Sequence, residues 1–415
     1  MGVTGFTPSV SRACIMSILL ICAGLVHKKS DVWSNICLSL LILLIINPYN
    51  IKNNGVLLSY GGTIGIISFL GVLKDNNEEK SIAPYKYKDK LLSYIKNIVK
   101  VSSSAQILIF PIIAYSYKTI SLTFIITNIL TSYIIGLIIM FGFLIVLISF
   151  PFIEIAKVMG KIYGTLIELL LLITENTAKL PLSKVYIKAP YIYEIVLYYI
   201  LVFYILYLYK NFGKEWIFEK IRKFISKIKK ELKTVLVIAS IISILFVFLQ
   251  TIPKDLKIYF IDVDQGDSCL ITTPFNKKIL IDGGGSATND VGKQILLPYI
   301  LNRRITDIDY MICSHFDTDH IGGLKAILEN IKVKNIVISK QKEEYENFKE
   351  IMNIVRTKNI NVIVVKRGDI LKFDKSSYMK IIYPLEKLAH NDINNNSIVA
   401  KFVCNGRKIL FTRRY

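Results

Sequence analysis

Long apolar runs in the first 250 residues constrain this chain more than any other feature of its sequence. Stretches such as "ACIMSILLICAGLV" and "IIGLIIMFGFLIVLI" approach the roughly 20 apolar residues that a helix needs to cross a bilayer core. The mean hydropathy of +0.46 agrees with this pattern. We therefore expect a polytopic α-helical membrane bundle of about eight spans. These are placed near residues 13–28, 33–48, 55–73, 104–117, 119–134, 136–153, 191–209 and 234–250.

Several segments of this helical part leave alternatives open. Segment 156–178 contains Glu168 and Glu175, so it could span the membrane facing the bundle interior or lie in the interface. An amphipathic stretch around 91–98 is expected to form a separate interfacial helix. Segment 210–233 carries nine Lys or Arg against three Glu, which indicates a cytoplasmic flank next to anionic lipids or, as the alternative, a contact for nucleic-acid phosphates.

The net charge of +21 has the same two readings, and we favour membrane topology for most of it. If 210–233 is cytoplasmic, the span at 234–250 carries the chain across the membrane. The domain that follows then lies on the extracytoplasmic side. The six cysteines are scattered without a CxxC pair, so the sequence predicts no disulfide framework and no cysteine zinc site.

The long apolar runs end near Pro253, and the pattern of residues changes after it. Short β-rich runs such as "LKIYFIDV", "SCLITT" and "KKILIDGG" come first, each closed by turn residues, and later strands alternate with helices. This order predicts an αβ sandwich with sheets packed inside helical layers. We therefore divide the chain into a helical membrane domain, 1–250, and a mixed α/β domain, 251–415.

A cluster of metal-binding side chains follows the predicted strand "DIDYMICS". The run "HFDTDHIGG" supplies His315, Asp317, Asp319 and His320 within six positions. Imidazole nitrogens and carboxylate oxygens bind ions such as Zn²⁺ or Mn²⁺. Alternate residues of a turn can face one centre and the adjacent Asp319 and His320 another, which suits two ions roughly 4 Å apart for phosphoester hydrolysis. The alternative is a polar loop with incidental histidines.

The same run resembles the signature of the metallo-β-lactamase superfamily, with Asp317 where many members carry a second histidine. "FIDVDQGDSCLI" is similar to the superfamily's first strand and turn, and "ILIDGGG" to the strand whose aspartate supports the ligand loop. The resemblance implies a partial αβ/βα metallo-β-lactamase-like sandwich. It implies that Asp282, with Asp262 and Asp267, surrounds and orients the metal ligands.

The resemblance also implies a role for each ligand. His315 and Asp317 are expected to hold one divalent ion, Zn or Mn. Asp319 and His320 are expected to hold a second ion and to act in catalysis.

The helical part resembles the competence domain of ComEC-type DNA-internalisation channels, on "TGFTPSVSRACIM", "NPYNIKNNGVLLSYGGTIGI" and "SSSAQILIFPIIAYSY". This resemblance implies DNA uptake during natural transformation, with one strand translocated across the bacterial cytoplasmic membrane and a fused nuclease-like domain for the other. The partners it implies are DNA, membrane lipids and other competence proteins, namely a DNA receptor and a helicase.

Three departures from the family pattern shape these expectations. The family's N-terminal oligonucleotide-binding-like domain is absent before "TGF", and the sequence stops after "ILFTRRY", before the family's later "HHGS" motif, so we expect a chain truncated at both ends. Arg413 and Arg414 stand where the family has Gly and a metal-bridging Asp, and guanidinium groups cannot ligate metal. A one-base shift in their codons would read Gly-Asp, which makes a frameshifted, non-functional gene fragment one alternative.

With these ligands replaced, we expect weak metal retention and little hydrolysis. His390 is either a third histidine ligand or, as we favour, a surface-loop residue. A membrane-anchored metallo-hydrolase of a small substrate is the other alternative function. We rank it lower, since an anchor needs only one span.

Overall fold

The computed structural model describes residues 5–73, 87–286, 289–340, 345–385 and 396–412. The chain forms two compact units, Met1–Phe218 and Glu219–Tyr415.

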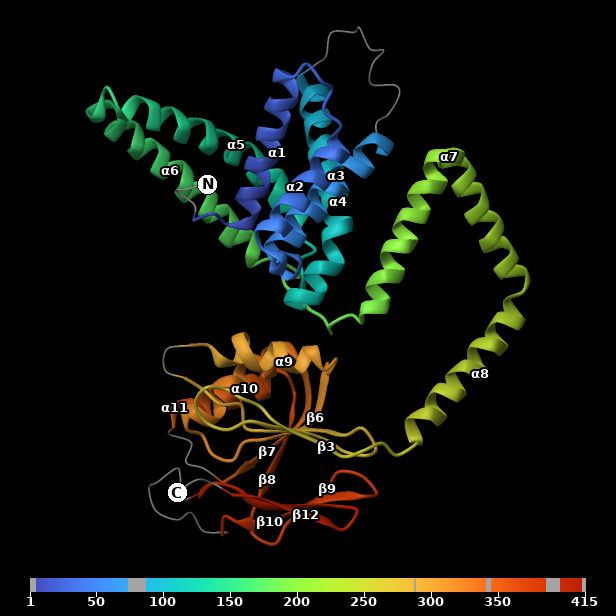
Figure 1. Ribbon diagram of the computed structural model, residues 1–415. Coiled ribbons are helices and arrows are strands. Elements are labelled where there is room, and N and C mark those ends of the chain that lie inside the picture. The colour runs from blue at the N-terminus through green and yellow to red at the C-terminus, as the bar shows by residue number, and fades with distance from the viewer. Residues whose placement is uncertain (1–4, 74–86, 287–288, 341–344, 386–395, 413–415) are drawn as a thin grey trace. The chain divides into compact units, whose positions relative to one another are not determined.

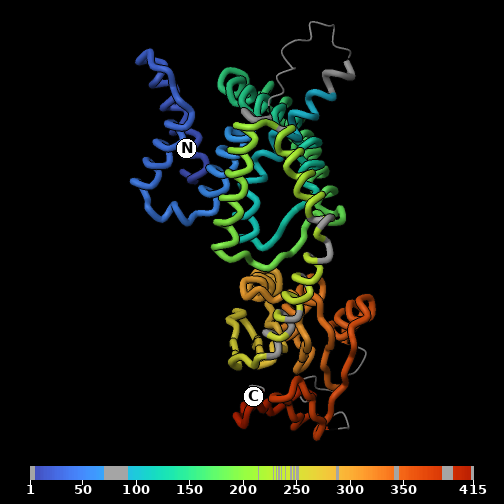
Figure 2. The backbone as a smooth tube through the Cα atoms, turned by 90° about the vertical axis from the view of Figure 1, so that its right-hand side faces the viewer, coloured from blue at the N-terminus to red at the C-terminus, as the bar shows by residue number. Residues whose placement is uncertain are grey.

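The first unit is helical (Figure 1 and Figure 2). Two-residue strands β1 (Thr119–Ile120) and β2 (Val185–Tyr186) pair antiparallel between its helices. The helix α3 packs along α4, and α5 along α6. The helices are α1 (Pro8–Leu25), α2 (Val32–Ile46), the 3₁₀ turn η2 (Pro48–Lys52), α3 (Asn54–Leu73), α4 (Tyr87–Tyr117), α5 (Phe124–Ser149), α6 (Ile153–Ala178) and the first part of α7 (Ile192–Lys230).

Close approach of α3 and α4 depends on glycine. A Cβ built at Gly65 would lie 2.5 Å from the backbone oxygen of Ser104, so a larger residue would push the two helices apart. Small residues at such contacts let helices pack through their backbones, which is how helices associate in lipid.

Four described helical segments are long and apolar enough to cross a membrane: Pro8–Leu25, Leu92–Tyr117, Phe124–Ser149 and Ile192–Gly213. Two shorter apolar helices, Val32–Ile46 and Asn54–Phe69, accompany them. Large apolar side chains on these helices face outward, among them Ile139 and Phe143, each 68% exposed. The predicted helical membrane bundle is confirmed as a fold class.

Two sequence-based predictions for this unit are wrong. The spans predicted at 119–134 and 136–153 form the single helix α5, because Gly136 costs a helix only about 1 kcal/mol and does not break it. The predicted interfacial helix around 91–98 is continuous with α4, since no proline or cap separates them. The open segment 156–178 lies within the helix α6.

The basic segment predicted at 210–233 continues the last helix of the first unit. Helix α7 runs through it with a kink at Gly213, whose φ of 76° is outside the helical region. Helix α8 (Leu232–Thr251) follows and covers the span predicted at 234–250.

Two sheets form the core of the second unit (Figure 1). The six-stranded sheet has the order β3-β4-β5-β6-β7-β8, antiparallel from β3 to β5 and parallel from β5 to β8. Its strands are β3 (Lys257–Phe260), β4 (Cys269–Thr272), β5 (Lys278–Ile281), β6 (Asp307–Ile312), β7 (Lys332–Ser339) and β8 (Asn361–Val365). The antiparallel four-stranded sheet has the order β12-β11-β10-β9, with β9 (Ile370–Lys372), β10 (Ser377–Tyr383), β11 (Val399–Cys404) and β12 (Arg407–Phe411).

Side-chain alternation along the strands builds two apolar layers. Ile271, Ile279 and Phe402, none with measurable exposure, belong to the core between the two sheets. Their neighbours Leu270 and Leu280 are also fully buried and point to the opposite face. The helices lie on that face in Figure 1: the π-turn η3 (Gly292–Leu296), α9 (Leu297–Asn302), α10 (Thr318–Asn330) and α11 (Glu346–Thr357). The predicted sandwich is confirmed.

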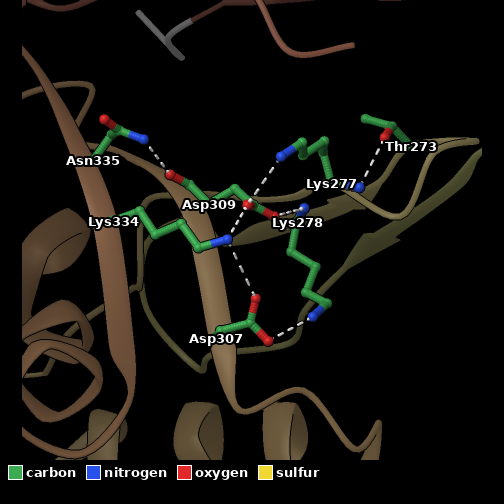
Figure 3. Close-up of polar contacts among 7 residues, drawn as sticks. All are labelled: Thr273, Lys277, Lys278, Asp307, Asp309, Lys334 and Asn335. Atoms are coloured by element: carbon green, nitrogen blue, oxygen red, sulfur yellow. Dashed lines mark hydrogen bonds and ion pairs between the residues drawn. The ribbon is translucent and has the colours of Figure 1, made fainter. Parts of the chain in front are cut away.

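The N-terminal end of β6 carries a network of lysines and aspartates, the Asp309 network (Figure 3). Asp309, with a side chain 5% exposed, accepts hydrogen bonds from the backbone N–H of Lys278 at 3.0 Å and from Lys334 Nζ at 2.7 Å. Lys278 Nζ pairs with Asp307 at 2.7 Å. These contacts join β5, β6 and β7 at one end of the sheet.

Candidate metal centre

The predicted ligand loop lies at the C-terminal end of β6, where three neighbouring segments hold its backbone. Cys313 N–H donates to Val337 O at 2.9 Å, and Ile398 N–H donates to Ser314 O at 2.8 Å. Asn347 of α11 donates from Nδ2 to Phe316 O at 3.1 Å. The loop is therefore anchored from β7, from the four-stranded sheet and from a helix.

Helix α10 begins at Thr318, three residues earlier than the helix predicted from about residue 321. Asp317 occupies the N-cap position with extended backbone, so the turn of the chain comes before the last two predicted ligands. Asp319 and His320 consequently lie in the first turn of a helix rather than in a loop.

Asp282 is the hub of hydrogen bonds beneath the ligands. Its carboxylate accepts from Ser314 N–H at 2.7 Å, from Ser314 Oγ and, at 2.9 Å, from His320 Nδ1. Its side chain is only 6% exposed. Its φ of 53° is rare for a residue with a Cβ, and such backbone strain is typical of functional sites.

Three of the predicted ligands meet at one point. One ligand atom each from His315, Asp319 and His320 lie within 4.8 Å of one another. The two imidazole rings are 4.1 Å apart between centroids. Ser314 Oγ lies 2.9 Å from His315 Nδ1, and Asp282 occupies His320 Nδ1, so both rings keep Nε2 toward the carboxylates.

The electrostatics of the group favour a cation. Burial opposes protonation of His320, but its hydrogen bond to Asp282 and the charges of Asp282, Asp319 and Asp267 together raise its pKa. Burial foremost, with the charge of Asp282, raises the pKa of Cys313 well above its ordinary value, which makes that thiol a core residue rather than a ligand.

Backbone-to-backbone packing under the ligands requires glycine. A Cβ built at Gly266, whose φ is 80°, would lie 1.6 Å from Asp319 O, and one at Gly285 would lie 1.8 Å from Thr318 O. Gly283 N–H donates to His320 O at 2.7 Å. The two loops after β3 and β5 are thus pressed directly against the first turn of α10.

The other predicted site residues lie around this group. Asp317 Oδ2 is 3.5 Å from His315 Nε2, but Asp317 is not part of the three-residue group. Asp267 is exposed, and its backbone oxygen accepts from Gly284 N–H. Asp262 is also exposed and accepts from the backbone N–H of Asp264 at 3.3 Å. His390, Arg413 and Arg414 lie outside the described residues.

Sequence reasoning missed Ser314 and Asn347. Ser314 contacts both Asp282 and His315, and its position directly between the end of the strand and the first ligand was the available signal. Asn347 lies in a different helix and offered no sequence signal, because its contact to Phe316 depends on how α11 packs.

The donor set fits a divalent cation. Two imidazole nitrogens and one carboxylate are donors that Zn²⁺ takes in catalytic sites, which leave a further position open. The group borders a cavity of about 270 Å³ that reaches from His320 and Asp282 to Ile398 and Phe411. A reacting molecule can therefore approach the donors from the space between the two sheets.

The comparisons with protein families agree with both parts of the chain. The family model described as competence protein matches residues 1–212, and the metallo-beta-lactamase superfamily model matches residues 261–391. The chain therefore belongs to the competence protein family and carries a metallo-β-lactamase domain after its helices. That superfamily implies a divalent metal.

A curated relative supports the pairing of the two parts. ComE operon protein 3 of Bacillus subtilis (strain 168) is 23% identical over 430 residues, which cover 99% of this chain and 50% of the relative. The chain thus spans about half the length of that relative.

Solved structures similar to the second unit share little sequence with it. A Cronobacter sakazakii metallo-β-lactamase with a HARLDQ motif is 15% identical, covers 40% of this chain and 62% of its own, and has a TM-score of 0.27. CmlA, a diiron β-hydroxylase from Streptomyces venezuelae, is 16% identical, with coverages of 38% and 29% and a TM-score of 0.26.

Proposed function

We propose that this protein takes part in DNA uptake during natural transformation, as a channel in the bacterial cytoplasmic membrane that passes one strand of DNA. The observation that carries the proposal is the match of a single relative, ComE operon protein 3, along 99% of the chain. That match runs through both the apolar helices and the metal centre, so the two parts are expected to serve one process.

The second unit is proposed to act on the phosphodiester backbone of DNA with His315, Asp319 and His320 as metal ligands. A divalent ion bound there supplies Lewis acidity and a lowered pKa for water. The residues of the chain supply the geometry: Asp282 fixes the tautomer of His320 through Nδ1, and Ser314 lies against Nδ1 of His315. Phosphate is expected to enter through the cavity that borders His320.

Asp317 beside His315 is the proposed additional ligand, and a second ion remains a prediction. Because Arg413 and Arg414 cannot supply the bridging carboxylate, we expect a weakly held second ion and slow hydrolysis. The domain after α8 is proposed to face the extracytoplasmic side, and a DNA receptor and a helicase are the proposed partners.

An uptake assay tests the proposal. The chain is expressed in a transformable host that lacks its own competence channel, and transformants per unit of donor DNA are counted. We expect transformation above the empty-vector level, and a matched chain with Lys325→Ala, an exposed change away from the donors, should behave like the original. Transformation at the vector level from a chain that inserts in the membrane would contradict the proposal.

A further inference from the structure

The helices α1, α2 and α3 contain a single charged residue, Arg12. A charged side chain within a membrane helix costs about 3 kcal/mol or more, and such residues usually face a polar interior or a water-filled path. The position of Arg12 in a membrane helix therefore points to a functional role as well as to a role in packing.

Arg12 lies in a line of polar side chains between α1 and α3, the Arg12 seam, formed by Ser9, Arg12, Ser59 and Thr63. Arg12 Nη1 donates to Ser59 O at 3.1 Å and to Thr63 Oγ1, and Ser9 Oγ donates to Ser59 Oγ at 3.1 Å. The spacings 9/12 and 59/63 put each pair on one face of its helix.

The contacts of Arg12 solvate its charge without neutralising it. All of its hydrogen-bond acceptors are neutral oxygens, and its Cζ lies 5.6 Å from the ring centre of Tyr60. Its Nε is buried and has no hydrogen-bond partner. Among the side chains that the structure describes, no carboxylate pairs with it, in contrast to the lysines around Asp309.

The guanidinium remains reachable from one side. Arg12, Ser59 and Thr63 are each partly exposed, whereas Tyr60 behind them is 5% exposed and hydrogen-bonds through its hydroxyl to the buried Ser39. The seam thus has an unneutralised cation and hydroxyl groups on its exposed side, and buried, packed side chains on the other side. A planar guanidinium in this setting matches a phosphate group, which it can bind with two N–H donors.

We propose that the Arg12 seam lines a hydrated path through the membrane and that Arg12 pairs there with backbone phosphates of single-stranded DNA. The identity of the anion rests on the proposed function in DNA uptake. The hydration of the seam rests only on the contacts of Arg12.

Thiol accessibility tests the seam in the full chain reconstituted in vesicles. In a background with the six native cysteines replaced, Thr63→Cys reports on the seam, and Ile21→Cys, 63% exposed and on the opposite face of α1, reports on the lipid side. An anionic methanethiosulfonate should modify residue 63 at least about 10-fold faster than residue 21. Equal, slow modification at both positions would show a dry packing contact and overturn the proposal.

Charge dependence then isolates Arg12. The ratio of anionic to cationic reagent rates at position 63 should fall several-fold with Arg12→Gln and be retained with Arg12→Lys. A ratio that is the same in all three chains would overturn the role of Arg12. The ratio cancels differences in protein amount between chains, and slow modification that persists at position 21 in the Arg12→Gln chain excludes a general loss of folding.

An oligonucleotide of deoxythymidine identifies the anion. It should slow modification at position 63 in the Arg12 chain and have little effect in the Arg12→Gln chain. Protection by anionic lipid alone would contradict DNA as the ligand. If protection by the oligonucleotide is present while transformation fails, the seam binds DNA and only the proposed uptake function is lost.

Discussion

The two ends of strand β6 carry similar acidic side chains with opposite surroundings. At the N-terminal end, Asp307 and Asp309 pair with Lys278 and Lys334 across three strands (Figure 3). At the C-terminal end, Asp319 lies beside His315 and His320. No lysine or arginine pairs with that carboxylate among the described residues. Roughly 20 Å of strand separates the two ends.

The contrast shows how a fold places the same residue type in two different electrostatic surroundings. The Asp309 network neutralises its charges internally, so it has no need of a ligand. The cluster at the other end brings Asp319 together with two imidazoles, and no lysine or arginine among the described residues neutralises that carboxylate, which suits a bound cation. The position of lysines, which comes from strand order, decides between the two outcomes.

Removing a proposed metal ligand at the C-terminal end of β6 should have the largest effect, a loss of affinity for Zn²⁺. We expect His320→Ala to lower the affinity for Zn²⁺ by more than about 100-fold, because it deletes one of three donors, beyond the loss typical of a supporting residue. Competition with a chromophoric chelator on the detergent-solubilised full chain measures this affinity. Unchanged affinity would exclude His320 as a ligand.

Neutralising Asp282, which hydrogen-bonds to His320, should have the next largest effect on the affinity for Zn²⁺. Asp282→Asn removes the charge that orients His320 Nδ1 and leaves the three donors in place, so the affinity for Zn²⁺ should fall about 10–100-fold. The same chelator assay reads the result. An effect as large as that of His320→Ala would mean that Asp282 acts through folding or direct ligation.

The structural end should respond in stability and not in metal binding. Asp309→Asn leaves buried Lys278 N–H with a neutral acceptor and removes the charge that faces Lys334, so we expect a loss of about 1–3 kcal/mol. Oxidation of the fully buried Met311 by peroxide along a urea series gives the unfolding midpoint. The exposed pair Lys325–Glu350 is the control, and Lys325→Ala should cost under about 1 kcal/mol.

Acid should weaken the structural end. Burial favours the neutral form of Asp309, but hydrogen bonds from Lys334 and from Lys278 N–H, with the nearby lysine charges, lower its pKa overall. A folded-state pKa below the unfolded value of about 3.9 stabilises the fold above that pH, and this stability is lost as pH falls further. The urea concentration at the unfolding midpoint, read from Met311 oxidation, should decrease as the pH falls below about 4. The decrease should be less steep in the Asp309→Asn chain. Part of the pH dependence of stability should remain in that chain, because the pKa of Asp374 is also lowered.

The candidate ligands could be proposed from the sequence because four of them follow one strand within six positions. Their grouping could not, since the start of α10 at Thr318 decides which side chains point together. The motif suggests two pairs of ligands, His315 with Asp317 and Asp319 with His320. In the structure, Asp319 and His320 instead form one group with His315. Asn347 was invisible to sequence reasoning, because only the packing of α11 brings it to Phe316.

The sequence by itself determined the two kinds of region, because apolar run length and strand alternation are local properties that follow from helix and strand geometry. It also determined the chemistry of the donor run. Tertiary structure alone decided that Arg12 meets Ser59 and Thr63, that Asp282 lies under His320, and that lysines surround Asp309. Those contacts join residues 25 to 51 positions apart, and only the packing of whole helices and strands brings such residues within hydrogen-bond distance.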